Sequence, residues 1–303
     1  MRFLDPKTDF AFKKIFGSAQ SKGILLEFLN AILYNAQPTI VDLEILDPYQ
    51  SPQFQGIKES SVDVKAKLDN EKTVLIEMQV LNPLGFNKRV LYNAAKAYSL
   101  QLQRGQGYSR LRPVIALTIM DFILFRERDR VISRYQLREE QDGLLYGDDI
   151  ELIFIELPKF RKSLEELETL ADRWIFFLQQ TAGLEEVPAI LGESTRLGQA
   201  FQIAETSNLS PQEFDVLEGQ ELALEDSRNI VLQAVQDGRE EGLQVGLEQG
   251  LQQGLQQGLQ QGLQQSKRDI ARSLLDVLPP EIISQKTGLS LAEIEALRTE
   301  DEG

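Results

Sequence analysis

Two carboxylates and an amide, from Asp63, Glu77 and Gln79, lie within one short segment where they could act together on a ligand. In VDVKAKLDNEKTVLIEMQV, residues 62–80, Asp63 lies near the start, and Glu77 and Gln79 lie near the end. The segment reads as two strands joined by a turn, and if the turn centres on Asn70, Asp63 falls directly opposite Glu77. Directly opposed Cβ atoms are about 5 Å apart, where like charges destabilise a hairpin. Two acids tolerate that position by sharing a proton or by binding a cation.

The donor atoms of this pair indicate a divalent cation with oxygen ligands. The chain contains no histidine and no cysteine, which removes the commonest ligands of zinc and other transition metals. Oxygen donors favour Mg²⁺ or Mn²⁺, and Gln79 adds a third oxygen on the face of Asp63 and Glu77. A second interpretation stays open: the face is solvated, and Lys65 and Lys67 neutralise the acids.

The elements around the hairpin predict an α/β core over residues 1–183. Aliphatic residues alternate from Val62 to Val80 and should line the face of the hairpin that lies opposite Asp63. Helices are expected at 7–34, at 86–103 and around 174–178, and further strands at 39–46, 113–120 and 150–157. Alternating strands and helices of this kind are typical of a sheet covered by helices.

The remainder of the chain is expected to be helical and contains a repeat. Residues 184–230 are acidic, and within residues 231–266 a glycine recurs every four residues from Gly238 to Gly262, six of the seven followed by leucine. Each glycine costs a helix about 1 kcal/mol, or about 7 kcal/mol in all. The repeat is therefore either a flexible linker or a helix whose glycines let a second copy approach closely. The strict leucine spacing favours self-association through residues 238–265, as a coiled coil with right-handed winding.

Residues 267–303 read as a small helical tail that resembles a helix-turn-helix. Gly288 should end one helix, and Ser290 with Glu293 forms a capping box for the next. The last helix is acidic, which is unfavourable in a DNA major groove. A docking or oligomer-capping module is the better interpretation.

Charge is unevenly distributed along the chain. The net charge is −15, yet residues 86–138 hold eleven Lys or Arg and only three acids, whereas residues 139–303 hold 12 bases and 33 acids. The basic segment can contact phosphate, unless its charges are only solvated helix faces. No apolar run reaches the roughly 18 residues of a membrane span, and the start does not resemble a signal peptide, so a cytoplasmic protein without membrane partners is expected.

Several stretches together resemble the recombination-promoting nuclease and putative transposase family, within the PD-(D/E)xK nuclease superfamily. The matching stretches are DFAFKKIFG (9–17), VDVKAKLDNEKTVLIEMQV (62–80), RVLYNAAKAYSLQLQRGQGYSRLRPVIALTIMDF (89–122) and IELPKF (155–160). The resemblance implies a restriction-endonuclease-like core, with a mixed central sheet flanked by helices, followed by an all-helical C-terminal region. It also implies an endonuclease that hydrolyses DNA with Mg²⁺ or Mn²⁺, with a link to recombination or mobile elements.

The resemblance assigns roles to individual residues. Asp63 and Glu77 would be the metal ligands, and Gln79 stands where the motif usually has lysine. Because glutamine carries no charge, either Lys65 supplies the positive charge or this protein is a slow or inactive member.

Residues outside the hairpin are implicated too. Asp9 and Lys13 belong to the matching motif of the first helix, and Lys88, Arg89 and Lys96 would hold the DNA backbone. The alternative function is a catalytically weak or inactive nuclease-fold protein that binds DNA or self-assembles.

Overall fold

The computed structural model describes residues 3–50 and 60–301. The chain forms two compact units, residues 1–226 and residues 227–303. The strands are β1 (Leu43–Leu46), β2 (Tyr49–Gln50), β3 (Ser60–Ser61), β4 (Val64–Leu68), β5 (Thr73–Gln79), β6 (Val114–Met120), β7 (Ile132–Tyr135) and β8 (Ile150–Glu156). The α-helices are α1 (Asp9–Phe16), α2 (Lys22–Tyr34), α3 (Phe86–Ser99), α4 (Leu170–Gln180), α5 (Ala189–Gly192), α6 (Thr195–Ala204), α7 (Pro211–Leu274), α8 (Pro280–Thr287) and α9 (Leu291–Asp301).

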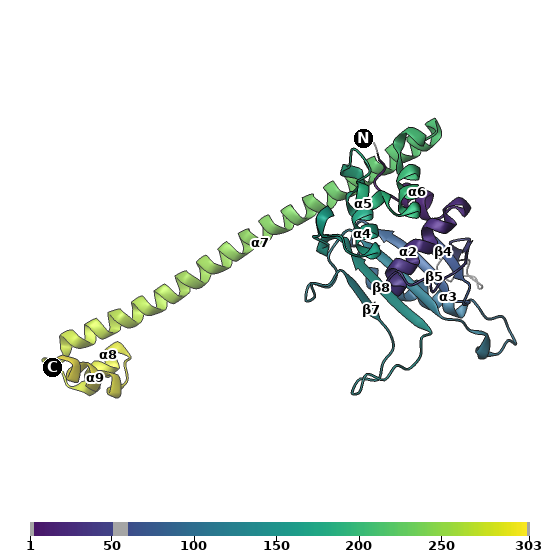
Figure 1. Ribbon diagram of the computed structural model, residues 1–303. Coiled ribbons are helices and arrows are strands. Elements are labelled where there is room, and N and C mark those ends of the chain that lie inside the picture. Colours follow the sequence, from purple (N-terminus) through teal and green to yellow (C-terminus); the bar gives the residue numbers. More distant parts are fainter. Residues whose placement is uncertain (1–2, 51–59, 302–303) are drawn as a thin grey trace. The chain divides into compact units, whose positions relative to one another are not determined.

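The first unit is built on a mixed six-stranded sheet. The strand order is β1-β4-β5-β6-β8-β7, with β5, β6 and β8 parallel to one another and the other pairs antiparallel (Figure 1). The continuous apolar run of β6 is buried at every position, as expected for a central strand with helices on both faces. The mixed sheet flanked by helices and the helical C-terminal region are confirmed.

Two apolar clusters cover the two faces of this sheet. On one face, α1, α2, α4 and α6 form the larger core, in which the rings of Phe16 and Phe28 contact the fully buried Trp174. This core reaches past residue 183, because Phe201 on α6 and Leu217 on α7 are buried in it. On the other face, α3 packs against β5, β6 and β8. β5 therefore lies between helices on both faces, whereas Lys65 and Lys67 of β4 lie on a face that is partly open to solvent.

The single helix expected at 7–34 is two helices. Gly17 ends α1 by donating its N–H to the Lys13 carbonyl at 2.8 Å, and a Cβ at this position would lie only 2.9 Å from the same oxygen. Thr8 caps the start of α1, its hydroxyl accepting from the Ala11 N–H. Asp9 therefore stands in the first turn of a short, independently oriented helix. The strand β7 was not predicted; it lies within the basic segment and pairs with β8.

The predicted register of the hairpin is confirmed. Val64 pairs with Ile76, and Lys65 pairs with Leu75. The predicted position of Val62 is wrong, because the chain bends at residues 62–63 before it enters β4. The Val62 side chain packs in the α3 cluster, on the face opposite to Val64.

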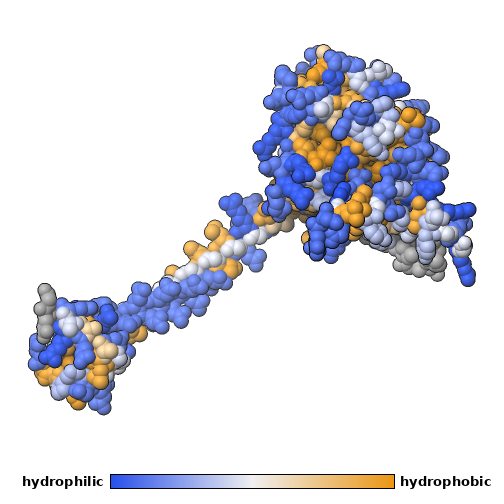
Figure 2. Space-filling model, turned by 60° about the horizontal axis from the view of Figure 1, so that its bottom comes forward, coloured by the Kyte–Doolittle hydropathy of each residue, from blue (hydrophilic) through white to orange (hydrophobic). Residues whose placement is uncertain are grey.

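The glycine repeat lies within one continuous helix, α7, which also runs through the limits expected at residues 230 and 266. At each glycine of the repeat, an added Cβ would meet nothing within 4 Å. The six leucines of the repeat are 56–76% exposed, and Figure 2 shows apolar surface along this helix. In the part of the chain that the structure describes, no helix combines the length and the apolarity needed to cross a membrane.

The tail has a small core of its own and the predicted caps. The end of α7, α8 and α9 bury Ala271, Ile283, Leu289, Ile294 and Leu297 against one another. Gly288 ends α8 with a φ of 73°. Ser290 donates its N–H to Glu293 at 2.8 Å and accepts the Glu293 N–H at 3.3 Å.

Candidate active site

Six side chains of interest lie near the carboxyl end of β5 in two contact groups: Asp63 with Lys13 and Asp9, and Glu77 and Gln79 with Arg89. Because β4 and β5 are antiparallel, the start of β4 lies beside the end of β5. Residues from four places contribute: Asp9 and Lys13 from α1, Asp63 from the bend before β4, Glu77 and Gln79 from β5, and Arg89 from α3. Ligand sites of α/β proteins commonly lie at the carboxyl ends of strands.

Asp63 is a buried carboxylate held by the backbone of the neighbouring strand. Its Oδ2 accepts the Met78 N–H at 2.7 Å, which the bend leaves without a ladder partner on β4. Its Oδ1 is 4.0 Å from Lys13 Nζ, and Lys13 is itself paired with Asp9 at 2.6 Å. Only 16% of the Asp63 side chain is exposed. Burial, together with the charges of Asp9 and Glu77, raises the pKa of Asp63 to about 7 against the opposing effects of the Met78 N–H and Lys13.

Glu77 and Gln79 share one cationic partner. Arg89 Nη2 donates to Glu77 Oε1 at 2.7 Å and also to Gln79 Oε1. The Glu77 side chain is 15% exposed, and burial raises its pKa while Arg89 acts in the opposite direction. Lys65 lies on the same face of β4, but no described residue forms an ion pair with it. The positive charge beside Glu77 therefore comes from α3.

The donor atoms present fit a hard divalent cation that keeps most of its water. One oxygen of each carboxylate is bound by the protein, so Asp63 Oδ1 and Glu77 Oε2 are the oxygens left to coordinate. Two carboxylates with several waters are a usual environment for Mg²⁺, and raised pKa values mean that a cation is favourable here. Within residues 3–50 and 60–301, no group of three or more acidic side chains is arranged to hold a metal. The donor types therefore suit an ion held by carboxylates and water.

The basic residues predicted on α3 differ in their surroundings. Lys88 is exposed beside a cavity that Glu77 also lines. Lys96 is only 7% exposed, and its Nζ lies 6.0 Å from the centre of the Tyr92 ring. Lys96 is thus largely buried, and its contact with the DNA backbone stays a prediction.

Much of the basic segment is used within the fold. Arg134 donates to the carbonyls of Ile32 and Leu33, and Arg112 pairs with Glu71. By contrast, Arg126, Arg128 and Arg130 are exposed on the loop after β6. That loop begins at Asp121, whose N–H donates to the Gln79 carbonyl at 3.0 Å. The exposed arginines thus follow the same sheet edge as the carboxylates.

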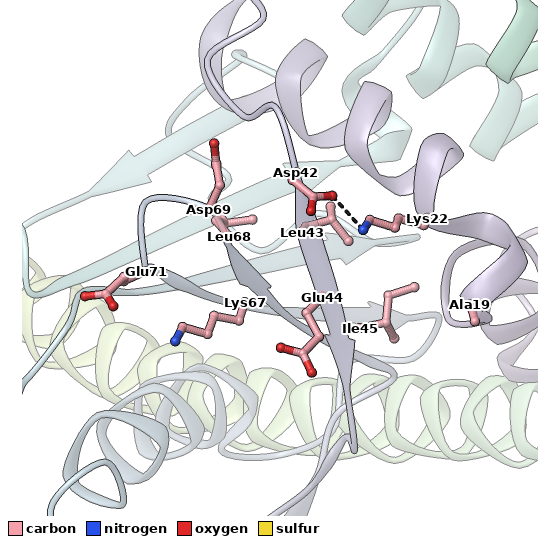
Figure 3. A pocket seen from close by; sticks show the side chains of 10 residues that line it. All are labelled: Ala19, Lys22, Asp42, Leu43, Glu44, Ile45, Lys67, Leu68, Asp69 and Glu71. Carbon is pink, nitrogen blue, oxygen red and sulfur yellow. Dashed lines mark ion pairs between the residues drawn. The ribbon is translucent and has the colours of Figure 1, made fainter.

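A second hollow, of about 520 Å³, lies beside the edge strand β1 (Figure 3). Two of its four acids, Asp42 and Glu71, pair with neighbouring cations. The hydrogen bond from Lys22 lowers the pKa of Asp42, and the one from Arg112 lowers the pKa of Glu71. Raised pKa values in a buried pair are the better marker of a functional site, so the Asp63–Glu77 pair is the stronger candidate.

Comparison with known protein families matches residues 6–234 to the family described as PD-(D/E)XK nuclease family transposase. The chain belongs to this family. Nucleases of the PD-(D/E)XK type generally use divalent metals, in accord with the oxygen donors at the end of β5. The comparisons with curated proteins and with solved structures found no match. The match ends within α7, before the first glycine of the repeat.

Sequence reasoning missed two features of this candidate site. It placed Arg89 on the DNA backbone, whereas the structure bonds Arg89 to Glu77 and Gln79. It assigned nothing to Asn93, which is 4% exposed and lines the same cavity as Glu77. The available signal is the spacing of four that puts Arg89 and Asn93 on one face of the helix after the hairpin.

Proposed function

We propose that this protein is a Mg²⁺- or Mn²⁺-dependent DNA endonuclease that hydrolyses phosphodiester bonds, with a link to recombination or mobile elements. The proposal is supported by two buried acids at the adjoining ends of β4 and β5, Asp63 and Glu77, where the charge of Glu77 contributes to the raised pKa of Asp63. The two side chains are 16% and 15% exposed, and each has a raised pKa. Keeping two poorly solvated acids together costs stability unless a cation binds between them.

The roles of the side chains follow from their positions. Asp63 Oδ1 and Glu77 would hold the ion, which when bound polarises the phosphate and makes water a stronger nucleophile. Lys13 and Arg89 stand beside the two acids, where they can offset the negative charge that develops on the phosphate. Arg89 takes over the role of the motif lysine, and Lys65 remains a second source of positive charge on the same face.

The DNA backbone would lie along the carboxyl edge of the sheet. Lys88 on α3 and the exposed arginines of the loop after β6 flank the carboxylates there. Phosphate contacts of this kind give affinity without sequence preference. Because the rest of the chain is strongly acidic, binding should be confined to this edge.

The proposal is tested by nicking of a supercoiled plasmid in Mg²⁺ or Mn²⁺. Asp63→Ala should lower the rate by more than about 100-fold, because even groups that only orient metal ligands contribute about 10–100-fold. The matched control is Asp69→Ala, an exposed acid in the turn of the same hairpin. Unchanged cleavage by Asp63→Ala would reject the site.

A second candidate is a nuclease-fold protein without catalysis that binds DNA. It is favoured by Gln79 in place of lysine and by the guanidinium of Arg89, which already bonds to Glu77. In that case the wild type retards DNA in a gel but nicks no plasmid at any Mg²⁺ or Mn²⁺ concentration. The endonuclease proposal requires metal-dependent nicking.

We also propose that residues 238–265 associate with a second copy of the chain. The leucines of this segment are more than half exposed, and the adjacent glycines leave open space where another helix can approach. Burying these leucines against a second copy would offset the helix cost of the glycines. Light-scattering masses of the full chain and of a chain ending before Gly238 test this association.

A further inference from the structure

A buried ion pair at the carboxyl end of β8 is not used by the proposed chemistry. The side chain of Glu156 is 0% exposed and that of Lys159 is 7% exposed, with 2.5 Å between Oε2 and Nζ. Both residues belong to the stretch IELPKF, one of those that resemble the nuclease family. Burying two charges is costly, and apolar side chains of similar size are often at least as stable. Stability alone therefore explains this pair poorly.

Both members of the pair bond to the backbone of the connection between β6 and β7, residues 121–131, which we call the arginine loop. Glu156 Oε1 accepts the N–H groups of Leu124 and Phe125 at 2.7 and 3.0 Å. Lys159 Nζ donates to the Phe125 carbonyl at 2.7 Å. Three backbone groups of two neighbouring loop residues are thus bonded to one buried ion pair.

The ion pair is itself fixed by the main core. It lies on either side of Leu157, which is fully buried. Gln179 on α4 donates to the carbonyls of Leu157 and Phe160, at 3.0 and 3.3 Å. The anchor of the arginine loop therefore has little freedom to move.

Both ends of the arginine loop are bonded to the sheet. The Asp121 N–H donates to the Gln79 carbonyl at 3.0 Å, and the Val131 carbonyl accepts the Glu156 N–H at 2.9 Å. Gln79 is two residues after Glu77 on β5, so the loop begins beside the candidate active site. Hydrogen bonds at its start, middle and end hold the loop in one shape.

The exposed part of this loop consists only of charged residues. Residues 126–130, RERDR, are all exposed, and three arginines against Glu127 and Asp129 leave a net charge of +1. A mobile segment of that charge would attract DNA weakly, because the two acids repel the phosphates that the arginines attract. In a loop of fixed shape, the arginines can meet phosphates without the acids. The ring of Tyr135, 5.8 Å from the Arg128 guanidinium, helps to orient one of them.

We propose that Glu156 and Lys159 are positioning residues that hold the arginine loop in the shape in which it contacts the DNA backbone. This inference rests on the proposed function, because it takes DNA as the ligand of the loop. Since the loop begins beside Gln79, its arginines would contact phosphates that neighbour the cleaved one.

The test is the salt dependence of DNA binding by the full chain. Anisotropy of a labelled duplex is measured at increasing KCl with a fixed concentration of Ca²⁺ in place of Mg²⁺, and a gel checks that the duplex stays intact. The slope of log affinity against log salt falls by about 0.9 for each phosphate contact that is lost. Replacing Arg126, Arg128 and Arg130 together by glutamine should therefore lower the slope by about 2–3.

The decisive variant removes the ion pair and keeps every arginine. Glu156→Leu/Lys159→Met leaves no unpaired charge in the core, so the first unit should still fold, which a urea titration checks. The N–H groups of Leu124 and Phe125 then have to reach water, and the loop should leave its position. The slope should fall by about as much as in the triple arginine variant. Combining all five substitutions should lower it no further, because both changes remove the same contacts.

Two control variants separate positioning from a general loss of stability. Glu156→Gln/Lys159→Met should keep a slope close to that of wild type, because the amide oxygen can still accept from Leu124 and Phe125. Lys162→Met/Asp172→Asn removes a nearby pair, at 2.9 Å, that has no bond to the arginine loop, and it should also bind like wild type.

Hydrogen exchange gives a test that needs no variant. The amides of Leu124 and Phe125 should exchange slowly in wild type, because a buried carboxylate binds both of them. Fast exchange of these two amides would overturn the anchor, whether or not the ion-pair variant folds.

The remaining outcomes also decide the matter. A wild-type slope in Glu156→Leu/Lys159→Met, or a further fall when its two substitutions are added to the triple arginine variant, would overturn the positioning role. If that happens while plasmid nicking still depends on Asp63, the proposed function stands without it. The expected slopes in a wild type that nicks no plasmid would support the positioning role and reject catalysis.

Discussion

Replacing Asp63 by asparagine should make the protein more stable above neutral pH while abolishing cleavage. Asparagine has nearly the same shape as aspartate, and its side-chain oxygen can still accept the Met78 N–H. The substitution removes a charge on a side chain that is only 16% exposed and lies beside two other acids. Function and stability are therefore opposed at this position.

The magnitude follows from the pKa of Asp63. It is about 7 in the folded protein against an ordinary value of 3.8. A difference of about 3 units corresponds to about 4 kcal/mol, because each unit is worth about 1.36 kcal/mol. The folded state holds the proton more tightly, so this residue lowers the stability of wild type as pH rises from about 4 to about 7. The Asp63→Asn variant lacks this loss, so the two proteins should be similarly stable near pH 4 and differ by about 4 kcal/mol at pH 8.

Unfolding by urea, followed by tryptophan fluorescence in EDTA, measures this difference. The only tryptophan, Trp174, is fully buried in the core of the first unit and therefore reports on that unit. Mg²⁺ at pH 8 should stabilise wild type and have little effect on Asp63→Asn. Asp69→Asn is the control in an exposed turn. The reasoning is refuted if Asp63→Asn is less stable than wild type at pH 8 in EDTA, or if it keeps the wild-type loss between pH 4 and 7.

Three further predictions concern other parts of the chain. Arg89→Leu removes the cation that lowers the pKa of Glu77, so the acidic side of the pH profile of plasmid nicking should move to higher pH. An unshifted profile would contradict this role of Arg89. Glu156→Leu leaves the buried ammonium of Lys159 without its partner at 2.5 Å and should cost about 3–5 kcal/mol in a urea titration, whereas an unchanged midpoint would argue against that pair. In a single helix, the methyl group of Gly250→Ala meets nothing, so the substitution should raise helix content. If a second helix packs against Gly250, the same substitution should lower the mass measured by light scattering. An unchanged oligomer would count against association through the glycines.

What the sequence predicted well is local. The register between β4 and β5 depends on one short turn and on strict alternation of aliphatic side chains, and both are visible in the sequence. Helix ends that depend on a single glycine or serine were also predictable, as Gly288 and Ser290 show. In each case the decisive partner lies within a few residues along the chain.

The features that could not be predicted from the sequence depend on contacts between segments far apart in the chain. The bend before β4 frees the Met78 N–H for the Asp63 carboxylate, and a perfect hairpin pattern gives no hint of it. The burial of Lys96 follows from how α3 sits on the sheet, because a lysine on an amphipathic helix is normally assigned to solvent. The same packing brings Arg89 onto Glu77, twelve residues earlier.

The glutamine at position 79 is best understood together with Arg89. A single guanidinium nitrogen donates to both Glu77 and Gln79, so the amide oxygen helps to fix the arginine beside the acid. A lysine at position 79 would instead place a second cation against that guanidinium and would compete for the same carboxylate. In the proposed site, Arg89 on α3 would supply the positive charge that the motif usually takes from the strand, and an uncharged acceptor on the strand suits such an arrangement. The departure from the motif thus agrees with the proposed site, in which Arg89 and a metal ion share Glu77.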